Sequence, residues 1–232
     1  MKSCCYNLIK KSGQNKLDWL KKMLHFVGTM KHLAQLSKDK KLKKIIELQA
    51  PYILKKRKQV WLHLCASIMS QQLSTKVAEV IYKRFLNLYP KQKPTLQLII
   101  DTPFETLRGV GLSNAKTGYV KNVCAFFTEE KITDARLDKM NNEELIKYLS
   151  QIKGVGQWTV EMILMFTLGR EDVLALDDLG IQQSMAKLYN LDTSNKKVLK
   201  EKMLYHSAKW SPYRTYACRY LWGWKDNVPV TK

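Results

Sequence analysis

The sequence contains no long apolar run. No stretch approaches the roughly 18 apolar residues that a membrane-spanning helix needs. The N-terminus, Met1-Lys2-Ser3-Cys4-Cys5, has no apolar segment long enough for a secretory signal. We therefore expect an intracellular protein without membrane contact, cytoplasmic (nucleoid-associated) if the organism is bacterial and nuclear if it is eukaryotic.

The sequence also lacks paired cysteines. Five cysteines are scattered along the chain, and no C-x-x-C pair occurs among Cys4, Cys5, Cys65, Cys124 and Cys218. Neither a zinc site nor an iron–sulfur cluster is indicated, and the last three cysteines are expected to be buried reduced thiols. We expect no cofactor.

Acidic residues are half as numerous as basic ones. Twenty Asp and Glu stand against forty Lys and Arg, which gives a formal charge of +20. Residues 1–60 alone hold 16 basic and 3 acidic residues. A surplus of this size attracts polyanions and favours nucleic acid as a partner. The alternative for any single lysine is an ordinary solvated surface.

Strand signals are few, so the sequence predicts an all-α fold of about ten helices. Only residues 173–176 could be extended. Ser74 begins a helix that should place Val77, Val80, Ile81, Phe85 and Leu88 on one face. Further N-caps are expected at Thr102, at Ser113 for a helix to about Phe127, and at Asn141; Glu105 and Glu144 would close capping boxes.

A Gly-x-Gly turn, Gly154 and Gly156, separates two amphipathic helical segments. Glycines let a phosphate approach the open N–H groups of a helix N-terminus and allow positive φ values. The alternative is a plain helix joint with a C-cap glycine. A similar turn at Gly109 and Gly111 is not followed by an acid pair at a comparable distance, so we assign it a structural or auxiliary role.

The chain resembles the helix–hairpin–helix DNA glycosylase superfamily, and within it the 3-methyladenine DNA glycosylase II (AlkA-like) branch. The resemblance spans about residues 30–224 and rests on five ordered segments. These are Ser67-Ile68-Met69-Ser70-Gln71-Gln72-Leu73-Ser74, Gly111-Leu112-Ser113-Asn114-Ala115-Lys116, Ile152-Lys153-Gly154-Val155-Gly156-Gln157-Trp158-Thr159, Leu176-Asp177-Asp178-Leu179-Gly180, and Trp210-Ser211-Pro212-Tyr213-Arg214-Thr215-Tyr216-Ala217 with Tyr220-Leu221-Trp222.

The resemblance implies two lobes with the active site in the cleft between them. We expect a basic extension at residues 1–28, one lobe from 29–65 plus 190–232, and the other from 66–189. The second lobe would hold the helix–hairpin–helix at residues 150–166. Its DNA-binding residues would be Lys153, Gly154, Val155, Gly156, Gln157 and Thr159.

The resemblance also assigns the chemistry. Asp178 would stabilise the positive charge that builds on the sugar as the N-glycosidic bond breaks. Asp177 would cap or orient the helix beginning near Leu179. The alternative for both acids is simple helix capping.

Trp158 stands where lyase-active relatives place a lysine, so no Schiff base is expected here. Its ring should instead stack on a flipped cationic base, with Met162 and Trp222 beside it. The alternative for Met162 and Trp222 is core packing.

Two further roles follow from the resemblance alone. Gln72 or Leu73 would fill the gap that a flipped base leaves, although Leu73 could equally pack inward. The backbone carbonyls of Ser150, Ile152 and Val155 would hold a monovalent cation that supports a phosphate. No metal is needed for the chemistry.

The sequence therefore predicts a monomeric, monofunctional DNA glycosylase of base excision repair, acting on double-stranded DNA that contains alkylated purines such as 3-methyladenine and 7-methylguanine. The alternatives are a non-catalytic binder of damaged or unusual DNA structures, and a glycosylase for a different lesion. Asp178 favours the glycosylase over the non-catalytic binder, because a protein that only binds DNA has no need for an acid facing an anionic ligand.

Overall fold

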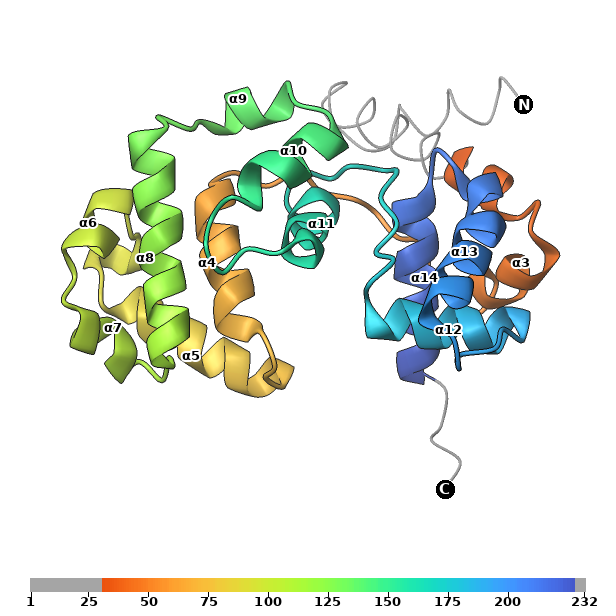
Figure 1. Cartoon of the computed structure of the whole chain (residues 1–232), viewed down its shortest axis with the longest axis horizontal. Helices are drawn as coiled ribbons and strands as arrows, with labels where there is room; N and C mark the ends of the chain where they lie inside the picture. Colours follow the sequence, from red (N-terminus) through yellow and green to blue (C-terminus); the bar gives the residue numbers. More distant parts are fainter. Residues whose placement is uncertain (1–30, 228–232) are drawn as a thin grey trace, which may run out of the picture. The chain divides into compact units, whose positions relative to one another are not determined.

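The computed structural model describes residues 31–227, and every regular element in this part of the chain is a helix (Figure 1). The predicted all-α class is confirmed, and residues 173–176 are irregular rather than extended in a strand. Within the described residues, no helix is long and apolar enough to cross a membrane. The predicted basic extension at residues 1–28 lies outside the described residues.

The helices divide into two compact units. The central unit, residues 54–182, contains α4 (Val60–Ser70), α5 (Thr75–Asn87), η1 (Pro90–Gln92), α6 (Leu96–Asp101), α7 (Phe104–Gly109), α8 (Asn114–Glu129), α9 (Asp134–Asp138), α10 (Asn142–Leu149) and α11 (Gln157–Phe166). The terminal unit, whose described residues are 31–53 and 183–227, contains α3 (Lys40–Ile46), α13 (Lys196–Ser207), η2 (Ala208–Trp210) and α14 (Arg214–Asn227).

The unit boundaries differ from the predicted lobes. A division after residue 65 would cut α4, which lies wholly in the central unit. The second boundary falls within α12 (Leu179–Tyr189), between residues 182 and 183, and not after residue 189. A continuous helix gives the sequence no break at which to mark such a boundary.

The core of the central unit forms around α8. This helix packs against α4, α6 and α7, and α4 in turn contacts α5 and α11 (Figure 1). Cys65 of α4 and Cys124 of α8 are buried thiols that form no disulfide, and Cys218 of α14 in the terminal unit is likewise buried without a disulfide. The prediction of buried reduced cysteines is confirmed at these three positions.

Polar N-caps start several helices where the sequence predicts them. The Ser74 hydroxyl accepts the Val77 N–H at the start of α5, and the Ser113 hydroxyl accepts the Lys116 N–H at the start of α8. Asn141 and Glu144 form a complete capping box at α10. Each cap satisfies backbone donors that the first turn leaves open.

One local prediction is wrong. Thr102 does not cap α7; it ends α6, where its hydroxyl donates to the Leu98 carbonyl. The helix predicted to begin at Ser74 is confirmed, and on its apolar face Ile81 and Phe85 are buried. The other three apolar residues of the predicted face are exposed: Val77, Val80 and Leu88.

A buried carboxylate ties the terminal unit together. Asp39 caps α3, and its side chain accepts hydrogen bonds from the Tyr189 hydroxyl, Trp210 Nε1 (3.1 Å) and Lys209 Nζ (3.0 Å). Burial alone would raise the pKa of Asp39, but these donors outweigh it and hold the pKa below its ordinary value. The charged form of Asp39 therefore links α3, α12 and η2.

Candidate active site

The turn between α10 and α11 is held rigidly from inside the central unit. The side chains of Ile152 and Val155 are buried, and the Val155 N–H donates to the Ile152 carbonyl at 2.9 Å. From α8, the Asn122 amide donates to the Lys153 carbonyl at 3.2 Å. The two helices and this turn form the predicted helix–hairpin–helix.

Gly154 is required by the geometry of the turn. Its φ is +101°, in the region that side chains avoid, and a Cβ built there would lie 2.1 Å from Cγ of Tyr119. Tyr119 belongs to α8, so the glycine lets the turn pack directly against that helix.

Gly156 does not adopt the positive φ that a glycine in a tight turn can provide. Its φ is −93°, which any residue can adopt, and nothing lies within 4 Å of a Cβ built there. It is the N-cap of α11 and provides no side-chain cap, whereas Ser113 caps α8 after the similar turn at Gly111. The α11 N-terminus is therefore open to an external group that accepts hydrogen bonds.

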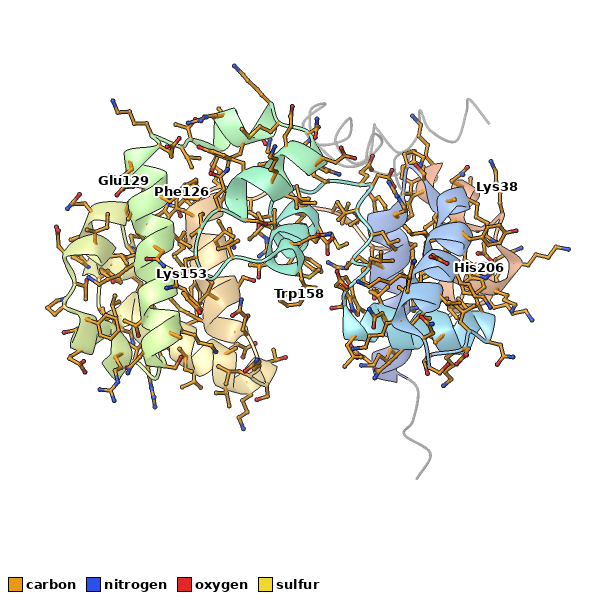
Figure 2. All side chains as sticks on the ribbon, viewed as in Figure 1. Lys38, Phe126, Glu129, Lys153, Trp158 and His206 are labelled. Carbon is orange, nitrogen blue, oxygen red and sulfur yellow. The ribbon has the colours of Figure 1, made fainter. Side chains whose placement is uncertain are left out.

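The predicted hairpin side chains divide into exposed and buried groups. Lys153 is exposed, as Figure 2 shows, and Gln157 is exposed while donating to Glu161 at 2.9 Å. The Thr159 side chain lies inside: the residue is only 2% exposed, and its hydroxyl accepts a hydrogen bond from the Gln71 amide at 3.3 Å. Its side chain therefore holds the chain at Gln71 and is not presented to a ligand.

Asp178 is the N-cap of α12. Its Oδ1 accepts the Ile181 N–H at 2.9 Å, and its backbone carbonyl accepts the Gln182 N–H at 2.9 Å. The sequence prediction gave this capping role to Asp177, which is exposed; the structure assigns it to the half-buried Asp178. One carboxylate oxygen is thereby fixed to the helix backbone.

Trp158 fixes the other oxygen. The indole Nε1–H donates to Oδ2 of Asp178 at 2.9 Å, so two predicted site residues 20 positions apart meet in the central unit. Trp158 is 36% exposed, and its side chain projects from the first turn of α11 (Figure 2). The carboxylate thus has a defined orientation beside an accessible aromatic surface.

A groove of about 490 Å³ brings two more predicted residues together. Leu73 and Met162 both line it, along with His63, Tyr82 and Phe166. All of these residues belong to the central unit. Trp222, the third predicted pocket residue, lies half-buried on α14 of the terminal unit.

The predicted wedge candidates lie in the exposed turn between α4 and α5. Gln72 has φ +58°, and Leu73 is 38% exposed. Lys116, which the sequence prediction gave no role, donates from Nζ to the carbonyls of Met69 (3.1 Å) and Gln71 (2.7 Å). A lysine in the first turn of a helix is disfavoured by the helix dipole, and that position is the signal that could have identified it.

The carbonyls predicted to hold a cation lie at the same hairpin. Ser150 ends α10, and Ile152 and Val155 follow in the turn. The Ile152 carbonyl already accepts the Val155 N–H, which leaves it one further lone pair.

Comparison with known proteins places this geometry in a family. Residues 65–208 match the HhH-GPD superfamily of base excision DNA repair proteins. The chain is also 37% identical over 204 residues to DNA-3-methyladenine glycosylase 1 of Schizosaccharomyces pombe, covering 87% of this chain and 88% of that relative. This chain belongs to the HhH-GPD superfamily. The match includes the turn at residues 71–74, the hairpin and Asp178.

Solved structures of HhH-GPD relatives share the fold. The S. pombe 3-methyladenine DNA glycosylase Mag1, in complex with abasic DNA, gives a TM-score of 0.74 at 34% identity, covering 83% of this chain and 95% of that chain. A DNA-3-methyladenine glycosidase from Bacillus halodurans gives a TM-score of 0.72 at 34% identity, covering 83% and 88%. The predicted helix–hairpin–helix glycosylase fold is confirmed.

Proposed function

We propose that this protein is a monofunctional DNA glycosylase of base excision repair, of the AlkA-like branch, that removes alkylated purines such as 3-methyladenine and 7-methylguanine from duplex DNA. The observation that carries the proposal is the Asp178 carboxylate, oriented by Trp158 beside an open helix–hairpin–helix. The names of the relatives support the substrate class.

Asp178 is the proposed catalytic group. As the bond between C1′ and the base breaks, the electron pair of that bond leaves with the base and neutralises the positive charge of an alkylated purine. Positive charge then builds on the sugar, and a carboxylate held by two fixed donors stabilises it without reorganising. Water adds to C1′ and loses a proton, which leaves an abasic site.

Trp158 is the proposed recognition surface for the base. A cationic purine is attracted to the face of an indole ring by stacking and by a cation–π contact. The ring is accessible on α11, and Met162 lies one helical turn further along the same helix. Trp222 on α14 is the third residue that the resemblance assigns to the base pocket.

The hairpin is the proposed anchor on the DNA, which the protein binds as a monomer. The open N–H groups at the start of α11 suit a backbone phosphate, with Lys153 adding positive charge. A monovalent cation on the carbonyls of Ser150, Ile152 and Val155 would support the same phosphate. Gln72 or Leu73 would fill the gap left by the flipped base.

No lyase step is proposed, because Trp158 has no amine to form a Schiff base. The test uses methylated duplex DNA and follows both free bases and strand breaks. We expect release of 3-methyladenine or 7-methylguanine, intact abasic strands, and no covalent adduct after borohydride treatment. Binding without release of any methylated base would support a non-catalytic binder or a different lesion, and a trapped adduct would overturn the monofunctional assignment.

The two hairpin glycines should respond differently to alanine. Gly154→Ala forces a positive φ on a residue with a Cβ and a clash with Tyr119, so the free energy of unfolding should fall by about 1–3 kcal/mol. Gly156→Ala meets no such clash, and its cost in stability should stay below about 1 kcal/mol. Chemical denaturation measures both values.

Duplex binding separates the two positions further. The methyl group of Gly156→Ala would stand where the phosphate must approach, so this folded variant should bind duplex DNA more weakly than the wild type. Fluorescence anisotropy at fixed salt concentration measures the difference. Unchanged binding by Gly156→Ala would remove the α11 N-terminus from the DNA interface.

A further inference from the structure

The C-terminus of α4 obtains hydrogen bonds from outside its own helix. The Gln71 and Leu73 N–H groups donate to the Ile68 and Ser70 carbonyls. The carbonyls of Met69 and Gln71 instead accept hydrogen bonds from the Lys116 ammonium of α8. One lysine therefore satisfies two carbonyls at the negative end of the α4 dipole, which favours a cation.

The position of Lys116 on α8 is unfavourable for a positive charge, and these acceptors offset that cost. It is the third residue of α8, whose N-terminal dipole disfavours positive charge. Its side chain is half-buried, and that burial lowers the pKa of the ammonium. Both effects oppose a charged lysine here, so the two carbonyl bonds are what compensate for them.

The turn that follows α4 needs such support. Gln72 adopts φ +58°, a conformation that costs a non-glycine residue about 1 kcal/mol or more and persists only when its surroundings impose it. Gln71 is held on its other side by the Thr159 hydroxyl of α11. Thus α8 and α11 both bind the turn, and Trp158 stands next to Thr159 on α11.

We propose that Lys116 is a positioning residue for base excision: it fixes the turn at residues 71–74 so that Leu73 enters the gap left by the flipped base. This proposal rests on the proposed glycosylase function. Lys116 touches neither substrate nor Asp178 and acts only through the backbone of the turn. A displaced wedge lowers the fraction of bound DNA in which the damaged base is fully extruded.

The first experiment needs no DNA. Hydrogen exchange of the segment 70–77 is compared in the wild type, Lys116→Met, Lys116→Arg and the control Lys121→Met. Lys121 is a matched control, because it also lies half-buried on α8 and donates to a helix-end carbonyl, that of Ile100, at 2.8 Å. We expect faster exchange in Lys116→Met alone, with slow exchange restored in Lys116→Arg; equal exchange in all four proteins would overturn the proposal.

The second experiment tests the connection to the wedge. Single-turnover release of methylated bases from duplex DNA should fall about tenfold in Lys116→Met, since small displacements of a positioning group cost this much or more. In a Leu73→Ala background the same substitution should have no further effect, because the group that it positions is absent. Multiplying effects would show that Lys116 acts independently of Leu73 and would overturn the proposal.

The outcomes distinguish the proposed glycosylase function from the proposed role of Lys116. If the wild type releases no base while Lys116→Met loosens the turn, the glycosylase assignment fails and the contact between Lys116 and the turn stands. If the turn loosens and the rate of release is unchanged, the role of Lys116 in excision is overturned. Normal release by Lys121→Met excludes a general effect of removing a lysine from α8.

Discussion

Asp178→Asn is expected to lower the rate of methylated-base release by about a hundredfold or more, which is the usual cost of removing one preorganised electrostatic group. The fold should survive, because asparagine is as good an N-cap as aspartate and can still accept the Ile181 N–H. The amide NH2 would then face the Trp158 N–H and could not accept it, so the loss would report the missing negative charge together with this hydrogen bond, and not a damaged helix. Single-turnover release from methylated duplex DNA measures it.

Asp177→Asn is the matched control. It removes the same charge from the neighbouring, exposed residue and should leave the rate of release close to that of the wild type. Duplex binding by Asp178→Asn should be retained or improved, because a negative charge no longer faces the phosphates. Equal release by Asp178→Asn and the wild type would remove this carboxylate from the mechanism.

Trp158 variants should separate two contributions of one side chain. Trp158→Phe keeps an aromatic face but loses the N–H that orients Asp178. A hydrogen bond to a charged group contributes about 1.5–3 kcal/mol, so the rate of the chemical step should fall about tenfold or more. Trp158→Ala also loses the stacking surface and should lower the affinity for the damaged site further.

The measurement compares single-turnover rates at saturating enzyme with the affinity for lesion-containing duplexes. We expect Trp158→Phe to alter mainly the rate and Trp158→Ala to alter both quantities. Trp61→Phe is the control, because this tryptophan of α4 lines a different groove, with Thr95 and Gln97. A phenylalanine variant as fast as the wild type would show that the Trp158–Asp178 hydrogen bond does not serve the reaction.

Sequence patterns predicted the local structure best where a short-range rule decides it. Ser74, Ser113 and the Asn141–Glu144 box cap the helices expected of them, because each bond spans three residues. Thr102 failed because a threonine can equally end the preceding helix. The apolar face of α5 was predicted correctly, but which of its residues are buried depends on what packs against the helix, and α5's own sequence does not state that.

Identifying the candidate site and its contacts required both the family resemblance and the structure. The resemblance singled out Asp178 and Trp158, yet their hydrogen bond joins residues 20 positions apart and no local rule predicts it. The resemblance also counts Thr159 among the DNA-binding residues, and only the structure shows that its side chain is buried and accepts a hydrogen bond from Gln71. Lys116 lies within one of the segments that resemble the family, but its acceptors lie more than 40 residues away at the C-terminal end of α4.

The shared bond between Trp158 and Asp178 constrains how such an enzyme can be redesigned or can diverge. Because the ring proposed to read the base also orients the acid, a change at position 158 that broadens the range of lesions should also slow base release. Met162 lines the groove with Leu73, and its side chain has no N–H that could orient Asp178. A directed-evolution library for new lesions should therefore vary Met162 and keep Trp158 fixed.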